Sequence, residues 1–402
     1  MALSSRPGKE WSGNTHSGTL PYIIVNICHF TSTFFPRIGG VEIVVSNLAR
    51  QQTELGHRVM VLTPRIRGTD NHVELPYRVA HYSRPSSKRY LTRQVLFRLL
   101  WEHFRMPFDV LHCHSAYPHG YVASTFSQLT GVPVVITPHG PTDILRDEQI
   151  RKNPKLLKRL AKGLRTATSI TAISQHIDTE IMSVGGIGRD KVFVIPNGVT
   201  LADFEGVEPY RHKCPYIFAM GRMVPQKGFD LLIHAFARVI EKTENLNLLL
   251  AGEGVHRQDY ERLAKELGLG GRVEFLGLVQ GRQKVAFMEG AEFFVCPSRF
   301  EPFGIVVLEA LAAGVPVIAH RVGGIVDIVE EGVEGHLVNP ENTRELADKI
   351  LDLHSSPDRR AQFAKMASIK AQDYDWTKIN QRYMDVYYKG METRKRKKQA
   401  GD

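Results

Sequence analysis

The feature that most constrains the fold is an alternation, along nearly the whole chain, of short apolar, β-branched runs with longer segments of helical periodicity. The runs are apolar throughout, which indicates strands buried on both faces, in parallel sheets with helices above and below. The expected strands are residues 22–30, 58–63, 109–115, 132–138, 169–174 and 192–196 in the first half, and 216–220, 246–251, 273–276, 293–297 and 316–319 in the second.

Two domains are expected, because 402 residues exceed one ordinary hydrophobic core. Between the two series of strands, residues 197–215 lose periodicity and gain glycine, proline and charge, which is typical of a hinge. Ligands of open α/β sheets bind beyond the carboxyl ends of the strands, so we expect the site between the domains. The predicted division is a flexible tail (1–20), a first Rossmann-like domain (21–198), a hinge (199–214), a second Rossmann-like domain (215–373), a closing helix (374–390) and a basic tail (391–402).

Charge and cysteine content narrow the classes of function. No apolar run approaches the ~20 residues that span a bilayer, and the polar N-terminus lacks the apolar core of a signal peptide. The four cysteines are far apart, as in a protein of the reducing cytoplasm, where we expect this chain. The 52 Lys and Arg residues exceed the 42 Asp and Glu residues, which favours phosphate-bearing partners: a nucleotide, a lipid headgroup or a nucleic acid.

Two acidic residues in the second half point to a binding site. Glu309 lies alone inside a long apolar helical run, where a carboxylate needs hydrogen-bond partners, and the two hydroxyls of a ribose would supply them. Glu301 lies upstream in an E-x7-E spacing, before a Pro-Phe-Gly turn into the same helix. The free amides and positive dipole at that helix start would suit a diphosphate.

Two cations follow the first strand of the second half. In the segment GRMVPQKG, Arg222 and Lys227 leave the carboxyl end of a buried strand. There they would bind a diphosphate and stabilise the charge that develops on it as a glycosidic bond breaks. The alternative is that both side chains are ordinary solvated cations on a loop. The glutamates of the E-x7-E segment disfavour that alternative.

With these motifs in place, the chain resembles glycosyltransferase family 4, the glycosyl transferases group 1 set. The resemblance covers nearly the whole chain. It is carried by GRMVPQKG, the E-x7-E pair, FFPRIGGVE with Gly39 and Gly40, ITPHG with His139, the hinge NGV, AGEG with Gly252 and Gly254, and VEFLG.

The resemblance implies a GT-B fold, with two Rossmann-like α/β/α domains, a cleft between them and a last helix that crosses back to the first domain. It implies a retaining, metal-independent transfer of a hexose-type sugar from a nucleoside diphosphate sugar, with no cofactor, to a lipid, glycan or small-molecule acceptor. It also implies a role for each matching position: Arg222 and Lys227 on the diphosphate, Gly39 and Gly40 near the donor phosphate, Glu309 on the ribose, Glu301 near the sugar beside the amides of Phe303, Gly304 and Ile305, His139 on the transferred sugar, and Gly252 and Gly254 in the nucleotide-sugar site.

Other functions match the sequence less well. A nucleotide-sugar isomerase of the 2-epimerase type is the main alternative, because such enzymes share a GT-B-like architecture. A nicotinamide oxidoreductase is disfavoured, since TSTFFPRIGG and not G-x-G-x-x-G follows the first strand. Nucleic-acid binding lacks a recognisable signature. A zinc site at His112, Cys113 and His114 is disfavoured, because a strand offers too few ligands at workable spacing.

Two basic amphipathic segments of the first domain permit two interpretations. Residues 88–105 and 151–165 combine leucines and aromatic residues with many Lys and Arg residues. Such helices can lie on an anionic membrane surface, which would suit a membrane lipid acceptor and a peripheral location. They can equally be helices with a core-facing apolar stripe and a solvated basic face.

Overall fold

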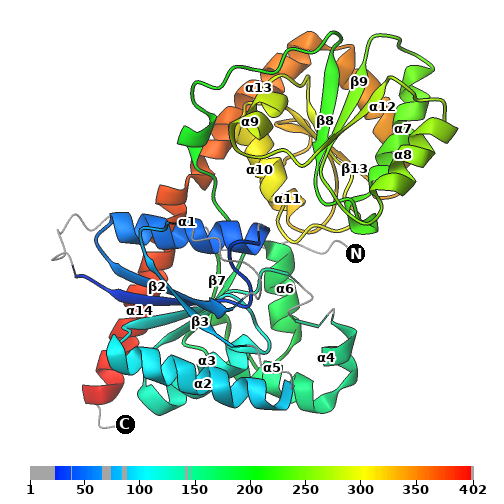
Figure 1. The fold of residues 1–402 in the computed structure, drawn as a ribbon. Coiled ribbons are helices and arrows are strands. Elements are labelled where there is room, and N and C mark those ends of the chain that lie inside the picture. Colours follow the sequence, from blue (N-terminus) through cyan, green and yellow to red (C-terminus); the bar gives the residue numbers. More distant parts are fainter. Residues whose placement is uncertain are drawn as a thin grey trace, which may run out of the picture.

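The protein consists of two α/β domains, each built on one fully parallel sheet covered by helices on both faces (Figure 1). The computed structural model describes residues 23–37, 39–65, 74–83, 88–140, 144–145 and 147–399. The two-domain architecture predicted from the sequence is therefore confirmed. The tail predicted for residues 1–20 lies outside the described residues.

The first sheet has seven strands in the spatial order β3-β2-β1-β4-β5-β6-β7. Its central strands are buried at nearly every position, as uniformly apolar runs require of a doubly covered sheet. The chain changes direction across the sheet between β1 and β4, so the loops after β1 and β4 diverge and leave room for a ligand. The strands are β1 (Asn26–Phe30), β2 (Arg58–Pro64), β3 (Arg78–Tyr82), β4 (Val110–Cys113), β5 (Val134–Ile136), β6 (Ser169–Ala172) and β7 (Val192–Val194).

Helices cover both faces of this sheet. On one face lie α1 (Gly40–Glu54) and α14 (Trp376–Gln399), and on the other α2 (Lys88–Arg105), α3 (His119–Thr130) and α5 (Pro154–Thr166) (Figure 1). Helix α5 begins at Pro154 because Asn153 accepts hydrogen bonds from the first free amides and a proline is favoured at the first helical position. The short α4 (Glu148–Lys152) precedes α5, and α6 (Gln175–Ser183) follows β6.

The second sheet has six strands in the order β10-β9-β8-β11-β12-β13. Helices α7 (Phe229–Ile240), α8 (Arg257–Glu266) and α12 (Thr343–His354) lie on one side of it, and α9 (Gly281–Glu289), α10 (Ile305–Ala312) and α13 (Pro357–Ala371) on the other (Figure 1). A short α11 (Ile325–Ile328) follows β12. The strands are β8 (Tyr216–Met220), β9 (Asn247–Ala251), β10 (Val273–Gly277), β11 (Phe294–Cys296), β12 (Val317–His320) and β13 (Gly335–Val338).

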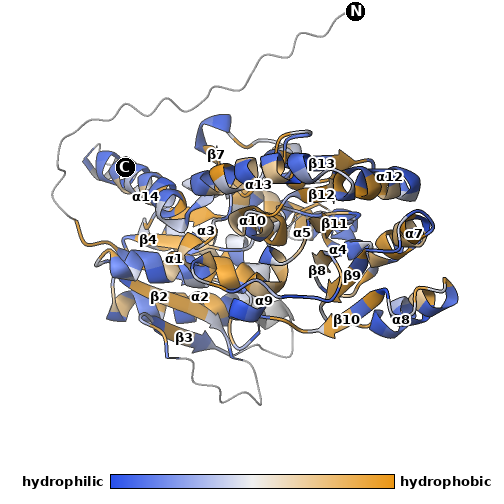
Figure 2. Ribbon diagram, turned by 90° about the horizontal axis from the view of Figure 1, so that it is seen from above, coloured by the Kyte–Doolittle hydropathy of each residue, from blue (hydrophilic) through white to orange (hydrophobic). Residues whose placement is uncertain are grey.

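The last helix returns to the first domain, as predicted. Trp376 at its start is 2% exposed and packs so closely on the segment after β7 that a Cβ at Gly198 would lie 2.6 Å from the indole ring. From there α14 passes along the first sheet and buries Tyr383 and Tyr387 (Figure 1). It runs to Gln399 and so includes most of the segment predicted as a basic tail, whose hydrophilic turns are blue in Figure 2.

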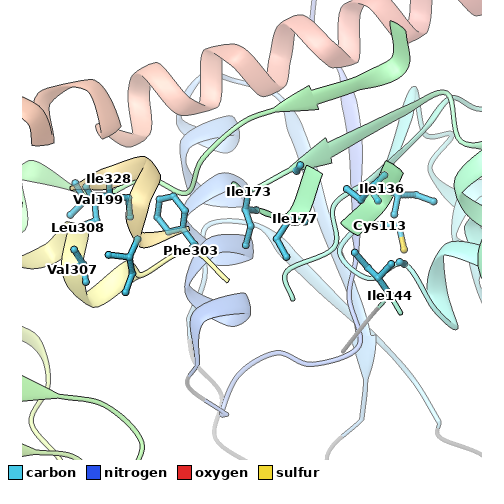
Figure 3. Close-up of a cluster of buried hydrophobic side chains, with 14 of the residues drawn as sticks. Cys113, Ile136, Ile144, Ile173, Ile177, Val199, Phe303, Val307, Leu308 and Ile328 are labelled. Carbon is cyan, nitrogen blue, oxygen red and sulfur yellow. The ribbon is translucent and has the colours of Figure 1, made fainter. Parts of the chain in front are cut away.

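The loops at the carboxyl ends of the two sheets meet at the domain interface. The hydroxyl of Ser174, after β6, donates to the carbonyl of Pro302, before α10, at 2.7 Å. Figure 3 shows the ring of Phe303 between Ile173 of the first domain and Leu308 of the second, in one continuous apolar cluster. Buried contact at this edge holds the loops after β6 and β11 against each other.

Candidate functional site

The loop after β8 carries both predicted cations. Arg222 is exposed, and its side chain makes no hydrogen bond or ion pair with any residue that the structure describes. Lys227 ends a short 3-10 turn, and Gly228 follows it with φ 67°. A Cβ at Gly228 would lie 2.0 Å from the carbonyl oxygen of Pro297, so only glycine lets this loop approach the end of β11.

That close approach joins Lys227 to Glu301. The Lys227 Nζ atom lies 2.5 Å from Glu301 Oε2, and the two side chains are only 16% and 11% exposed. The hydroxyl of Ser298 lies 3.5 Å from the same carboxylate oxygen. Two residues that the sequence placed in separate motifs therefore form one shielded ion pair, and removing either partner would leave the other charge poorly compensated.

Helix α10 begins beside this ion pair with its backbone amides free. Gly304 precedes the helix with φ 109°, and no side chain caps it. Within the described part of the chain, the amides of Phe303, Gly304 and Ile305 have no acceptor. Unpaired N–H groups at the positive end of a helix dipole form an anion-binding site.

Glu309 faces a partner that the sequence did not reveal. Lys284 Nζ, on α9, lies 2.7 Å from Glu309 Oε1, and both side chains are largely buried. A carboxylate in an apolar helix needs a partner, and here a cation from the adjacent helix compensates its charge. Nothing in the residues around Lys284 signals this contact, because it depends on how α9 and α10 pack.

The Gly-Gly loop of the first domain lies against the start of α10. A Cβ at Gly40 would come within 3.2 Å of Ile305 Cδ1, across the domain interface. Gly39, the N-cap of α1, has no side-chain cap and would place a Cβ 2.8 Å from the carboxylate of Glu42. The structure thus brings the glycine loop and the α10 amides together at one point between the domains.

Gly252 and Gly254 lie against the loop after β8, which carries Arg222 and Lys227. Gly252 has φ 138°, and its Cβ would lie 1.9 Å from the carbonyl oxygen of Gly221. A Cβ at Gly254 would lie 2.4 Å from the carbonyl oxygen of Met223. Both glycines permit the loop after β9 to support the backbone on either side of Arg222, so their contribution to the site is through that loop.

His139 follows β5 and belongs to a buried cluster of imidazoles. Its Nε2 atom is 3.0 Å from Nδ1 of His114, and burial lowers the pKa of His139 to about 4, so the ring is neutral at neutral pH. One ring nitrogen from each of His29, His112 and His114 lies within 4.8 Å of the other two. Each of these nitrogens has a side-chain hydrogen-bond partner, which gives the cluster a structural explanation.

The thiol between these histidines lies elsewhere. The Sγ atom of Cys113 donates to the carbonyl of Ser115 at 3.3 Å, and the side chain packs in the apolar core. Consecutive residues of a strand face opposite sides of the sheet, which separates Cys113 from His112 and His114. The third imidazole of the cluster comes instead from His29 on β1, whose register places it beside His112.

Comparison with known proteins identifies the family. The family model described as Glycosyltransferase Family 4 matches residues 38–203, and that of Glycosyl transferases group 1 matches residues 204–369. An uncharacterized glycosyltransferase of Methanocaldococcus jannaschii is 30% identical over 397 residues, which cover 92% of this chain and 99% of that protein. The chain belongs to glycosyltransferase family 4.

Two further comparisons agree with this result. A phosphatidyl-myo-inositol mannosyltransferase of Mycolicibacterium smegmatis is 27% identical over 364 residues, or 87% of this chain and 90% of that enzyme. The Anabaena HepE structure in complex with UDP-glucose superposes with a TM-score of 0.74 at 23% identity, over 91% of this chain and 100% of that one. This likeness confirms the GT-B fold, and the protein is a glycosyltransferase.

Proposed function

We propose that this glycosyltransferase moves a hexose-type sugar from a nucleoside diphosphate sugar to an acceptor hydroxyl, with retention of configuration and without a metal or other cofactor. The observation that carries the proposal is the shielded Lys227–Glu301 pair beside the free amides of α10, opposite the Gly39–Gly40 loop. Cationic and amide donors there match the negative charge of a diphosphate.

Different residues of the site would bind different parts of the donor. Arg222 and Lys227 would neutralise the diphosphate together with the amides of Phe303, Gly304 and Ile305. Arg222 has no partner to give up among the described residues, so binding costs it no existing ion pair. These charges would also stabilise the leaving group as its charge develops.

Glu309 would hold the ribose. Its carboxylate accepts from Lys284 in the structure and has further lone pairs for the two ribose hydroxyls. Lys284 holds the carboxylate in place before the donor arrives. Glu301 and His139 would contact the transferred sugar, from the second and the first domain respectively.

The proposed reaction needs no protein nucleophile. The bond between the anomeric carbon and the diphosphate oxygen breaks, and its electron pair stays on that oxygen. The acceptor oxygen bonds to the anomeric carbon from the same face, and the acceptor proton passes to the departing diphosphate. Glu301 is already paired with Lys227, which suits it to orienting the sugar better than to attacking it.

The test is release of nucleoside diphosphate from a panel of nucleotide sugars, with and without candidate acceptors. We expect release that depends on an acceptor and persists in EDTA. Loss of activity in EDTA that added divalent metal restores would overturn the metal-free mechanism. Conversion of the donor without any acceptor would favour the nucleotide-sugar isomerase instead.

We also propose that the acceptor is a lipid at an anionic membrane surface, with the protein in the cytoplasm. The supporting observation is a stripe on α2, where Phe97, Trp101 and Phe104 are 71%, 47% and 83% exposed. They share one helix face with the exposed Arg93 and Arg105. Aromatic residues flanked by cations are typical of helices that lie in a membrane interface.

The second basic segment, residues 151–165, has no comparable exposed aromatic face, so the proposed membrane contact is confined to α2. On α5, Leu160 and Leu164 are fully buried, and the exposed residues are cations such as Lys158 and Lys162. Helix α5 is thus an ordinary helix with a core-facing apolar stripe, and only α2 leaves large aromatic residues outside. Among the described residues, no helix is long and apolar enough to cross a membrane.

Vesicle co-sedimentation tests this contact. We expect binding to vesicles that contain phosphatidylglycerol, little binding to pure phosphatidylcholine, and a loss of binding in the Phe97→Ser/Trp101→Ser variant. Val255, 85% exposed in the second domain, provides the matched control as Val255→Ser. Equal binding by the control and the α2 variant would refute the contact.

A further inference from the structure

A chain of hydrogen bonds runs through the first domain and ends at His139. The side-chain oxygen of Gln52, on α1, lies 2.8 Å from Nε2 of His29. Nδ1 of His29 lies 2.9 Å from Nε2 of His114, and Nδ1 of His114 lies 3.0 Å from Nε2 of His139. The three imidazoles come from β1 and from the ends of β4 and β5, which are neighbours in the sheet.

Every ring in this chain is neutral at neutral pH. Burial lowers the pKa of His29 and of His139 to about 4, and burial with neighbouring histidines lowers the pKa of His114 well below its usual value. A neutral imidazole carries one N–H donor and one acceptor nitrogen. The protons of such a chain must therefore all point the same way, and its end group decides which way.

Gln52 is that end group. In the structure the carbonyl oxygen of Gln52 faces Nε2 of His29, and a carbonyl oxygen only accepts. This orientation of the amide assigns the donor role to Nε2 of His29 and the acceptor role to Nδ1. His114 then donates to His29 from Nε2 and accepts at Nδ1, and His139 donates to His114 from Nε2. The proton of His139 is thereby committed to His114, and its Nδ1 atom is left without a proton.

We propose that Gln52, His29 and His114 are positioning residues that hold His139 as the Nε2–H tautomer, with Nδ1 as an acceptor for a hydroxyl of the donor sugar. Nδ1 of His139 has no partner among the residues that the structure describes, and the ring is partly exposed. The inference rests on the proposed function, in which His139 contacts the transferred sugar. It adds the chemistry of that contact: the sugar must donate a proton there, and a deoxy sugar lacking the hydroxyl loses the interaction.

His112 offers a matched control within the same cluster. Its ring centroid is 4.0 Å from that of His114, yet its nitrogens bond to the hydroxyls of Tyr387 and Thr137, both at 2.6 Å. His112 is as buried as His29, His114 and Gln52, and it contributes no nitrogen to the chain. Replacing His112 leaves every group of the path from Gln52 to His139 in place.

Long-range nitrogen–proton NMR of the histidine rings tests the proposal on the full-length protein without any ligand. We expect His139 to carry its proton on Nε2 in the unmodified protein and in His112→Gln. In Gln52→Met, which removes the terminal acceptor, both tautomers of His139 should appear. A proton on Nδ1 of His139 in the unmodified protein, or no change in Gln52→Met, would overturn the inference.

A kinetic measurement links the tautomer to specificity. With a donor that the enzyme turns over, Gln52→Met should lower kcat/KM about tenfold, the usual worth of one hydrogen bond to the sugar. This tenfold difference between the variant and the unmodified protein should vanish for a donor that lacks the contacting hydroxyl. The same tenfold difference with every deoxy donor would contradict the proposed contact. If no nucleotide sugar is turned over, the proposed function fails while the NMR result still decides the tautomer.

Discussion

Arg222 and Lys227 lie on one loop but should respond differently to removal. Arg222 is exposed and unpaired within the described chain, so Arg222→Ala should change the free energy of unfolding by less than ~0.5 kcal/mol. Lys227 is paired at 2.5 Å with Glu301 and only 16% exposed. Breaking a fully buried pair costs about 3–5 kcal/mol, and the residual exposure here reduces that to ~2 kcal/mol, or a Tm lower by about 4–8 °C.

Arg222→Ala and Lys227→Met should lose activity to a similar extent. Each removes a cation from the developing charge of the diphosphate, and the loss of one such group typically lowers kcat about 100- to 1,000-fold. The assay pairs thermal unfolding with initial rates of nucleoside diphosphate release. Adding Glu301→Gln to Lys227→Met should recover stability without recovering activity, because it removes the uncompensated charge and restores no cation. Undiminished turnover in both single variants would refute the diphosphate site.

Three further outcomes are expected. Gly228→Ala should destabilise the second domain by more than ~1–2 kcal/mol, seen in urea unfolding, because a Cβ meets the Pro297 carbonyl at 2.0 Å and φ is 67°; an unchanged midpoint would contradict this. Glu309→Gln should weaken nucleoside diphosphate binding about tenfold in calorimetry by removing a charged acceptor, with Lys242→Gln as the surface control. The pKa of His139 is about 4 in the fold against ~6.5 when unfolded, so the unfolded chain binds more protons and stability should fall as pH drops from ~6.5 to 4; His139→Gln should flatten the curve of Tm against pH.

The sequence predicted strands best where both faces are covered. Uniformly apolar runs marked eleven of the strands because burial on two faces excludes polar residues. Strands β3 and β13 were missed. The β3 sequence alternates exposed and buried residues at the sheet edge, and β13 begins with glycine and histidine, so neither satisfies a rule based on continuous apolar runs.

The candidate site divides in the same way. Arg222, Lys227, Glu301 and Glu309 could be found in the sequence because each follows a strand end or interrupts an apolar helix, and these are local properties. Their pairing could not be found, since Lys227 meets Glu301 only through the approach that Gly228 permits.

The sequence by itself determined the two parallel sheets and the strand ends that carry polar groups, because periodicity and burial act over short stretches of chain. Only the tertiary structure decided that Lys284 compensates Glu309 and that Gln52, far from His139 in the sequence, closes a line of three histidines. The physical reason is that hydrogen bonds and ion pairs depend on distances of about 3 Å between elements, and the packing of helices on sheets fixes those distances.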